Sequence, residues 1–404
     1  MISEGIIKKI GANLKMENAE VIEANGKHLT SGIIDEHSHI AISGGVNEGT
    51  QASSAEVRIQ DVVNPDDINI FRQLAGGVVG AQLLHGSANP IGGQSAIIKF
   101  RWGKSAEEMI FAEAPGFIKF ALGENVKQSN WGDNNVTRFP QTRMGVEQVY
   151  YDYFIKAEEY DNNKKKSSLY RKDLELEALA EILKSKRFIS CHSYVQSEIN
   201  MLMKVADSLK FKVNTFTHIL EGYKVADKMK QHGVSASTFS DWWAYKFEVI
   251  DAIPYNAAIL NKVGINTCIN SDDAEMARRL NQEAAKAIKY GQLSEEEAWK
   301  LVTLNPAKAL HVDKQTGSIK IGKSADLALW SGNPLSIYSS CEKTWVDGVL
   351  YFDRVNYPKQ VEFNNQERNR IIQKMLQAIA NGESPASLQK KEETRYGCMG
   401  QETH

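Results

Sequence analysis

The feature that most restricts the fold of this chain is an alternation of short apolar runs with helix-like segments over residues 32–311. Gly77–Leu84 and Gly116–Leu122 are largely apolar runs of strand length, whereas Asp173–Lys184 has its apolar residues at helical spacing. Continuous apolar runs are typical of strands buried on both faces, and strand–helix–strand alternation favours a parallel sheet. We therefore predict an α/β fold whose parallel sheet is either closed or open.

Both ends of the chain carry more strand signals than the middle. Residues 6–29 contain short alternating segments and the pair Asn25-Gly26, and Lys343–Asp353 contains Asp347-Gly348 between alternating apolar residues. Such pairs are typical of β-hairpin turns. We predict one small β-sandwich domain assembled from residues 1–31 and 312–365. Residues 32–311 then form the central domain, and residues 366–404 form an amphipathic C-terminal helix with a polar tail.

The composition is that of a globular protein. Hydrophobic residues make up 42% of the 404 residues and charged residues 24%, and the net charge is −2. This balance gives no electrostatic case for a nucleic acid partner or an acidic membrane surface, and no apolar run is long enough to span a bilayer. No signal-peptide pattern follows Met1. We expect a cytoplasmic protein as the chain stands, or an exported one if a leader has been removed.

Histidine and aspartate side chains stand where several predicted strands end. His37 and His39 are two residues apart, so in a strand they project to the same face and can ligate one metal ion. His192, His218 and Asp272 also follow apolar runs, and in a parallel barrel such ends form the active face. Taken singly, each histidine could be merely hydrogen-bonded, and Asp272 could cap the next helix. Their shared placement favours one site.

Longer motifs add a resemblance to a known family. Gly32–His39 resembles the first-strand signature of the amidohydrolase superfamily, and Asn305–Leu310 followed by Gly317–Trp330 resembles that superfamily's return from barrel to β-sandwich. The resemblance covers nearly the whole chain. It is strongest to an imidazolonepropionase-like branch without an assigned function, through Gly86–Gln94, Ala121–Asn125 and Glu221–Lys224. It implies a distorted TIM (β/α)8 barrel with a small β-sandwich domain, and a metal-dependent hydrolase acting on carbon–nitrogen bonds.

The resemblance also implies a set of metal ligands. His37 and His39 match the ligands of the deeper metal, His192 and His218 match two single histidines after later strands, and Asp272 matches the last-strand aspartate, with Asp273 as the less favoured neighbour. One ligand stays open between a glutamate and a carboxylated lysine that bridges two metals. Glu124 is favoured because it lies at the polar exit of its strand, whereas Lys119 lies mid-strand. The histidine-rich set leads us to expect Zn²⁺, as one or two ions.

The expected mechanism uses a water whose pKa the metal lowers to about 7. Asp272 takes the proton of this water and returns it to the leaving nitrogen, and His218 or His192 helps to stabilise the oxyanion. Residues 44–65 are long enough for a lid. Candidate contacts to a small-molecule substrate are Asn89, Gln94, Arg143, Tyr223 and Trp242. Arg143 could equally be an ordinary surface arginine, and Trp242 a core residue.

Three other hypotheses compete with this one. A metallo-dipeptidase, of the Xaa-Pro or acyl-amino-acid type, would share fold and site. A non-catalytic metal-binding barrel would keep the ligands without turnover. A nucleotide-binding open α/β protein has no support, because neither GxGxxG nor GxxxxGK[ST] follows a predicted strand. The sequence leaves a homo-oligomer open.

Overall fold

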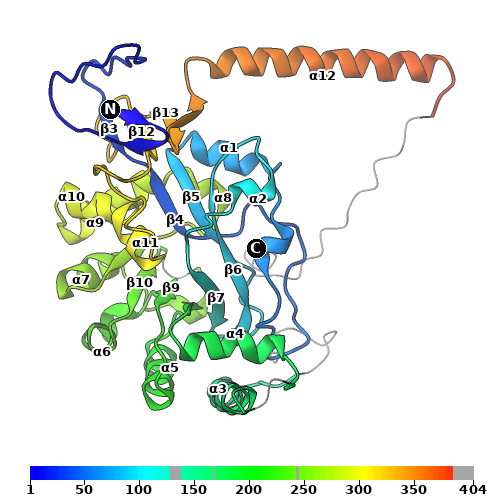
Figure 1. The fold of residues 1–404 in the computed structure, drawn as a ribbon, viewed down its shortest axis with the longest axis vertical. Helices are drawn as coiled ribbons and strands as arrows, with labels where there is room; N and C mark the ends of the chain where they lie inside the picture. The colour runs from blue at the N-terminus through cyan, green and yellow to red at the C-terminus, as the bar shows by residue number, and fades with distance from the viewer. Residues whose placement is uncertain (128–137, 167–168, 243–244, 385–404) are drawn as a thin grey trace.

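A computed structural model describes residues 1–127, 138–166, 169–242 and 245–384 (Figure 1). Its centre is an eight-stranded sheet in the order β11-β10-β9-β8-β7-β6-β5-β4, which confirms the predicted distorted barrel. The strands are β4 (Ile33–Ser38), β5 (Val78–Leu83), β6 (Ile91–Lys99), β7 (Gly116–Ala121), β8 (Arg187–His192), β9 (Thr215–Thr217), β10 (Ser235–Thr238) and β11 (Thr267–Ile269).

The barrel departs from a regular (β/α)8 pattern at β6. This strand pairs antiparallel with both β5 and β7, whereas the pairs β4–β5 and β7 through β11 are parallel. Only residues 84–90 join β5 to β6. A parallel crossover needs a dozen or more residues, so this short connection forces the chain to turn back as a hairpin.

Helices cover the outside of the barrel, and several begin at a capping side chain. Asp173 caps α4 by accepting from the Leu176 amide, and Ser294 caps α10 by accepting from the Glu297 amide at 3.2 Å. The helices are α1 (Ile68–Leu74), α2 (Ala106–Met109), α3 (Arg143–Lys164), α4 (Leu174–Leu183), α5 (Gln196–Leu209), α6 (Ala226–His232), α7 (Asn256–Val263), α8 (Ala274–Ala277), α9 (Leu280–Gly291), α10 (Glu295–Lys300) and α11 (Leu304–Ala309). Such caps satisfy amide groups that a helix leaves free at its start.

The second sheet joins the two ends of the chain, as predicted. Its order is β14-β13-β12-β3, all antiparallel, and comprises β3 (His28–Ser31), β12 (Leu327–Trp330), β13 (Cys341–Val346) and β14 (Val349–Asp353). Asp347 and Gly348 make the predicted hairpin turn, with φ of 49° and 75°. Asn25 and Gly26 also turn, but no strand lies between residues 8 and 27 to pair with β3, so the hairpin predicted there is wrong. Instead, β1 (Ile2–Ser3) and β2 (Ile6–Ile7) pair with each other.

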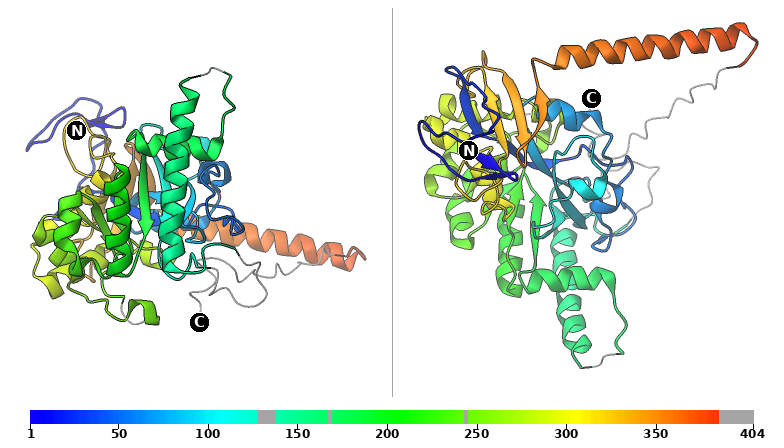
Figure 2. Two further views of the ribbon diagram at one scale, coloured as in Figure 1. Left: turned by 90° about the horizontal axis from the view of Figure 1, so that it is seen from below. Right: turned by 45° about the horizontal axis from the view of Figure 1, so that its top comes forward.

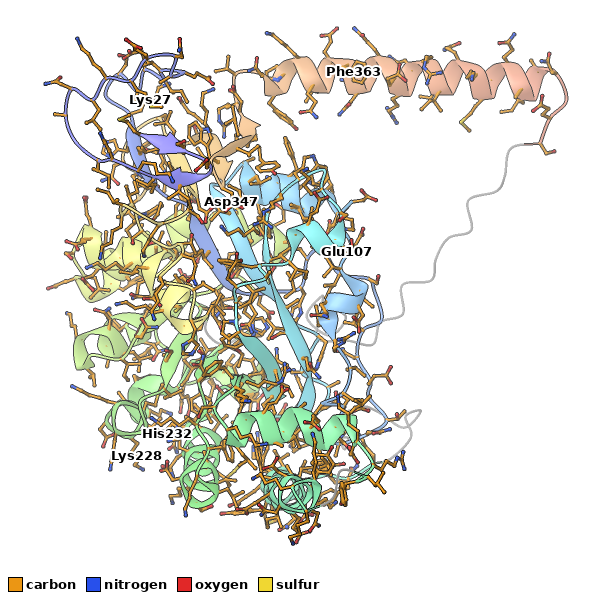
Figure 3. The ribbon with its side chains drawn as sticks, viewed as in Figure 1. Lys27, Glu107, Lys228, His232, Asp347 and Phe363 are labelled. Atoms are coloured by element: carbon orange, nitrogen blue, oxygen red, sulfur yellow. The ribbon has the colours of Figure 1, made fainter. Side chains whose placement is uncertain are left out.

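The C-terminal helix α12 (Tyr357–Ala380) leaves the body of the molecule (Figure 2). It begins before the predicted Gln366, and none of its side chains is buried. Figure 3 shows side chains around Phe363 pointing into solvent on all sides of the helix. Most of the predicted polar tail, residues 385–404, lies outside the described residues. Among the described helices, none is long and apolar enough to cross a membrane.

Candidate metal centre

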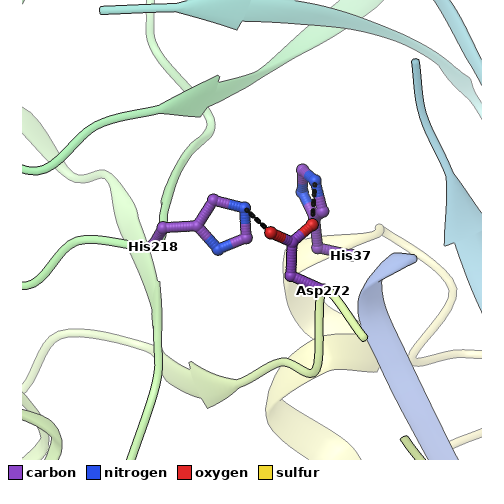
Figure 4. Close-up of side chains that lie close together, drawn as sticks. All are labelled: His37, His218 and Asp272. Atoms are coloured by element: carbon purple, nitrogen blue, oxygen red, sulfur yellow. Dashed lines mark ion pairs between the residues drawn. The ribbon is translucent and has the colours of Figure 1, made fainter. Parts of the chain in front are cut away.

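The carboxylate of Asp272 lies among three imidazoles at the ends of the barrel strands. Its Oδ1 is 2.9 Å from His39 Nε2 and 3.5 Å from His37 Nε2, and its Oδ2 is 3.6 Å from His218 Nε2. His37 belongs to β4 and His39 follows it, His218 follows β9, and Asp272 follows β11. Figure 4 shows His37 and His218 on two sides of this carboxylate. The fold therefore brings together side chains that are far apart in the sequence.

His192, the last residue of β8, completes the cluster. Its ring centroid is 5.2 Å from that of His218, and the His218 ring is 4.4 Å from that of His37. His192 Nε2 and His218 Nδ1 are buried and have no hydrogen-bond partner. Buried imidazole nitrogens without partners are unusual in folded proteins, and a bound cation is one explanation for them.

The protonation states of these groups suit a metal ion. Burial holds the pKa of His37 and of His192 well below the usual range and lowers the pKa of His218 to about 3, so all three rings are neutral. Burial opposes ionisation of Asp272, but the nearby His218 and His39 hold its pKa below the usual value. Neutral imidazoles and an ionised carboxylate are the forms that ligate zinc and similar metals. Candidate ligand atoms of His37, His218 and Asp272 lie within 4.8 Å of one another. The residues present thus fit a divalent metal.

Lys119 and Glu124, the two options for the remaining ligand, lie in different surroundings. Lys119 on β7 is 1% exposed, and its Nζ is 3.0 Å from His37 Nε2. Glu124 is half-buried, its amide donates to Glu248 Oε1 at 3.0 Å, and its charge is among those that raise the pKa of Glu248, after burial itself. The structure brings Lys119, rather than Glu124, into contact with the histidines.

Hydrogen bonds on the far side from Asp272 fix the orientation of His37, in β4, and of His39, directly after it. His39 Nδ1 lies 2.7 Å from the carbonyl oxygen of Leu84, so this nitrogen carries a proton and donates it to that oxygen, and Nε2 is the nitrogen that faces Asp272. Thr217 donates its hydroxyl proton to Glu36 Oε2 at 3.1 Å, and its oxygen lies 3.3 Å from His37 Nδ1. Because a hydroxyl has one proton, Thr217 accepts a hydrogen bond from His37 Nδ1. His37 Nε2 then carries a lone pair and no proton.

The carboxyl group of Glu36 is fully buried, and hydroxyl groups hydrogen-bond to it there. Burial raises its pKa to about 8, while hydrogen bonds from Ser237 and Thr217 lower it. Behind the candidate ligand His37 there is thus a chain of hydrogen bonds from its imidazole to the Thr217 hydroxyl and on to the Glu36 carboxyl. Such outer contacts orient ligating histidines and raise their basicity.

The seam of the barrel, where β4 meets β11, positions Asp272. Its amide donates to the His37 carbonyl at 3.2 Å, and the buried carboxyl of Asp35 accepts from the Ser271 amide at 3.1 Å and from the Ser271 hydroxyl. The neighbour Asp273 instead caps α8, accepting from the Glu275 amide at 2.9 Å. Only the first of the two aspartates contacts the histidines.

Three of the polar side chains considered as substrate contacts bind the backbone elsewhere. Asn89 donates to the carbonyls of Glu48 and Gln51, both at 2.6 Å, and Gln94 donates to that of Ala55 at 2.9 Å. These bonds pin residues 44–65, the segment considered as a lid, to the barrel. The Tyr223 hydroxyl donates to the Asp251 carbonyl at 2.8 Å on the surface.

His85, which follows β5, has both ring nitrogens occupied. Its Nδ1 lies 2.7 Å from the Gly86 carbonyl, and its Nε2 is bonded to the Gly93 amide. Burial lowers its pKa to about 4. These contacts give His85 a structural place in the turn between β5 and β6.

The other two substrate candidates, Arg143 and Trp242, contact side chains rather than the backbone. Arg143 at the start of α3 pairs with Glu198 at 2.9 Å and with Glu248 at 3.3 Å. Trp242 stacks on Phe239 at 4.3 Å, and Phe239 stacks on His218 at 4.8 Å. The aromatic residue Phe239 was not singled out from the sequence, since nothing in its local pattern indicates that it covers a histidine.

A family profile and a solved structure both relate this chain to amidohydrolases. The profile described as "Amidohydrolase family" matches residues 179–375. The crystal structure of an amidohydrolase from Thermotoga maritima MSB8 is 33% identical, covers 88% of this chain and 94% of that one, and superimposes with a TM-score of 0.81.

Curated relatives match the chain in longer and shorter stretches. Amidohydrolase tasK of Hapsidospora irregularis is 27% identical over an alignment of 392 residues, and the match covers 87% of this chain but 40% of that protein, so the chain spans well under half of its length. A dihydroorotase of Halalkalibacterium halodurans is 41% identical over 59 residues, which is 13% of this chain and 14% of that enzyme.

Proposed function

The chain belongs to the amidohydrolase family, and from this premise we propose that it is a metal-dependent hydrolase that cleaves a carbon–nitrogen bond of a small molecule, as in an amide, cyclic amide or amidine. The observation that carries the proposal is the cluster of His37, His218 and Asp272, whose candidate ligand atoms lie within 4.8 Å of one another in a buried position. A divalent ion, with zinc as the best match to these donors, would be held there.

The ligands proposed are the residues that converge on this point. They are His37, His39, His192, His218, Asp272 and Lys119. When bound, the metal supplies a water of lowered pKa and polarises the carbonyl oxygen. Lys119 takes the place considered for Glu124, because its Nζ is 3.0 Å from His37 Nε2. An ammonium cannot ligate a cation, so Lys119 would serve as a carbamate, formed from the neutral amine and carbon dioxide with loss of a proton.

Asp272 is the proposed proton carrier. Its carboxylate is ionised and lies within 4 Å of three imidazoles, so it can accept the proton of the attacking water. The same oxygen then returns the proton to the leaving nitrogen, which departs as a neutral amine. His218, held neutral by burial, keeps one ring N–H, and this group would stabilise the developing oxyanion by donating a hydrogen bond to it.

The test compares two neighbouring aspartates. Asp272→Asn should lower kcat/KM by about 100- to 10,000-fold, because a general acid–base residue contributes roughly that much. Asp273→Asn is the matched control, since asparagine also caps helices well and Asp273 binds α8. Metal content should be measured for both proteins. Undiminished turnover in Asp272→Asn would exclude its role in proton transfer.

The same preparation tests the alternatives. A panel of N-acyl amino acids, cyclic amides and dipeptides should reveal the preferred class, and preference for dipeptides would support the metallo-dipeptidase. A wild-type protein with stoichiometric metal and no turnover across the panel would support a non-catalytic barrel.

A further inference from the structure

The lysine Lys246 lies at the edge of the metal centre. Its Nζ is 4.3 Å from the ring centroid of Tyr194, and the Tyr194 ring in turn meets the His192 ring edge-on at 4.4 Å. These two contacts in series limit the distance from the ammonium to the centre of the His192 ring to about 9 Å. The side chain of Lys246 is 28% exposed, whereas Tyr194 is 1% exposed. Lys246 therefore lies on the solvent side of a buried ring that touches a candidate ligand.

An aromatic wall leads from the histidines to this ammonium. Phe239 stacks on His218, Trp242 stacks on Phe239, and Tyr245 meets Trp242 edge-on at 5.7 Å. The Tyr245 hydroxyl donates to that of Tyr194 at 3.1 Å. Aromatic faces hold Lys246 by cation–π attraction and offer an apolar surface beside it.

The ammonium keeps donors for a ligand. Its one ion pair among the described residues is with Glu248 at 3.8 Å, which is longer than a hydrogen bond. The other oxygen of Glu248 accepts from Arg143 and from the Glu124 amide. A group that enters from solvent can therefore make a direct, charge-assisted bond with Lys246.

Arg143, the other cation considered for substrate binding, is already neutralised by two carboxylates. It pairs with Glu198 and Glu248, whose side chains are only 4% and 1% exposed. A substrate carboxylate placed there would meet two buried carboxylates of like charge. The two cations therefore differ in their partners: Arg143 connects α3 to Glu198 and Glu248, whereas Lys246 has no ion pair of hydrogen-bond length among the described residues.

We propose that Lys246 binds a substrate carboxylate carried on the carbon next to the leaving nitrogen, so that the substrates are N-acyl amino acids or dipeptides rather than uncharged amides. In such molecules the scissile carbonyl oxygen and the carboxylate lie about 5 Å apart by standard bond lengths. With a charge-assisted hydrogen bond of about 2.8 Å, this reach is comparable with the limit of about 9 Å between the ammonium and the His192 ring. Phe239, Trp242 and Tyr245 then pack against the amino-acid side chain of the substrate, next to its carboxylate. This inference rests on the proposed function and names the substrate class of the same site.

The test uses matched pairs of ligands. N-acetyl-L-leucine and N-acetyl-L-leucinamide differ only in the charge next to the leaving nitrogen, and the measured quantity is the ratio of their kcat/KM values. Lys246→Met should reduce this ratio about 10- to 100-fold, because it removes a charge-assisted bond, and Lys246→Arg should restore most of it. Lys228→Met on α6 is the control, since that exposed lysine has no ion pair among the described residues, and it should leave the ratio unchanged (Figure 3).

A binding measurement separates this inference from the proposed function. The metal-loaded protein carrying Asp272→Asn should bind N-acetyl-L-leucine at least tenfold more tightly than the leucinamide, and Lys246→Met in that background should abolish the difference. If the wild type hydrolyses no amide but shows this preference in binding, the proposed function fails and the carboxylate site stands. Equal ratios in wild type and Lys246→Met overturn the inference, as does a ratio that collapses in Arg143→Lys instead.

Discussion

Thr217→Val offers a sharp test of the hydrogen bonds behind the metal centre. Valine has nearly the shape of threonine but no hydroxyl, so the substitution removes two contacts without leaving a cavity. The contacts are the bond of 3.1 Å to Glu36 and the contact of 3.3 Å with His37 Nδ1. Thr217 is fully buried, so no water of the bulk solvent replaces them.

Two separate losses follow from the structure. Leaving a buried polar group unsatisfied costs about 1–3 kcal/mol, and this loss appears in the free energy of unfolding of the metal-free protein. Removing the outer partner of a ligating histidine lowers metal affinity by about 10- to 100-fold, since His37 Nδ1 no longer has an acceptor that fixes its tautomer. The second loss corresponds to about 1.4–2.8 kcal/mol of binding free energy.

The assay measures both quantities on the same protein. Urea unfolding of the metal-free form gives stability, and competition with a chromophoric chelator gives the metal dissociation constant. Thr303→Val is the control, because Thr303 is also buried and donates to the Trp299 carbonyl at 2.7 Å, away from the site. It should lose stability and keep its metal affinity. If Thr217→Val lost stability but bound metal within twofold of wild type, the proposed orientation of His37 would be wrong.

Three further predictions concern the ligands and the C-terminal helix. His37→Ala should empty the deeper metal position, as measured by elemental analysis, and an unchanged metal content would show that the ligand assignment is wrong. Lys119→Met should lose metal and at least about 100-fold in activity, whereas Glu124→Gln should keep both; the reverse pattern would return the ligand position to Glu124. Ending the chain after Gln360 should change the free energy of unfolding by less than about 1 kcal/mol, because no α12 side chain is buried. A larger loss in urea unfolding would show that the helix packs on the body.

The sequence predicted the convergence of these strand ends because the end of a buried strand can be recognised from a few neighbouring residues. A strand buried on both faces reads as an apolar run, and the first polar side chain after it marks the rim. His37, His192, His218 and Asp272 all stand at such points, so the barrel topology alone places them together. The direction of β6 was not visible in this pattern, because an apolar run reads the same whichever way its strand points.

The choice between Glu124 and Lys119, which stays a prediction, depends on an assumption in the same reasoning. The preference for Glu124 assumed that a ligand lies at the polar exit of its strand. Lys119 lies between Ile118 and Phe120 and is 1% exposed, and a charged side chain so deeply buried is rare unless it is paired or bound. A lysine within an apolar strand is therefore a sequence signal for a side chain that is paired or bound inside the barrel. The roles of Asn89 and Gln94 had no such signal, because their acceptors lie some forty residues earlier in the chain and only the folded structure reveals them.

Backbone strain links the seam of the barrel to the chemistry of the centre. His218 and Asp272 both have left-handed conformations, with φ of 58° and 52°, directly after β9 and near the end of β11. Such conformations cost a non-glycine residue of order 1–3 kcal/mol and persist only where surrounding contacts fix them. For Asp272 those contacts are the bond from its amide to the His37 carbonyl and the bonds of the preceding Ser271 to Asp35. The hydrogen bonds that close the barrel are therefore also those that turn the Asp272 carboxylate towards the histidines, so the barrel cannot loosen at β4 and β11 without disturbing the candidate metal centre.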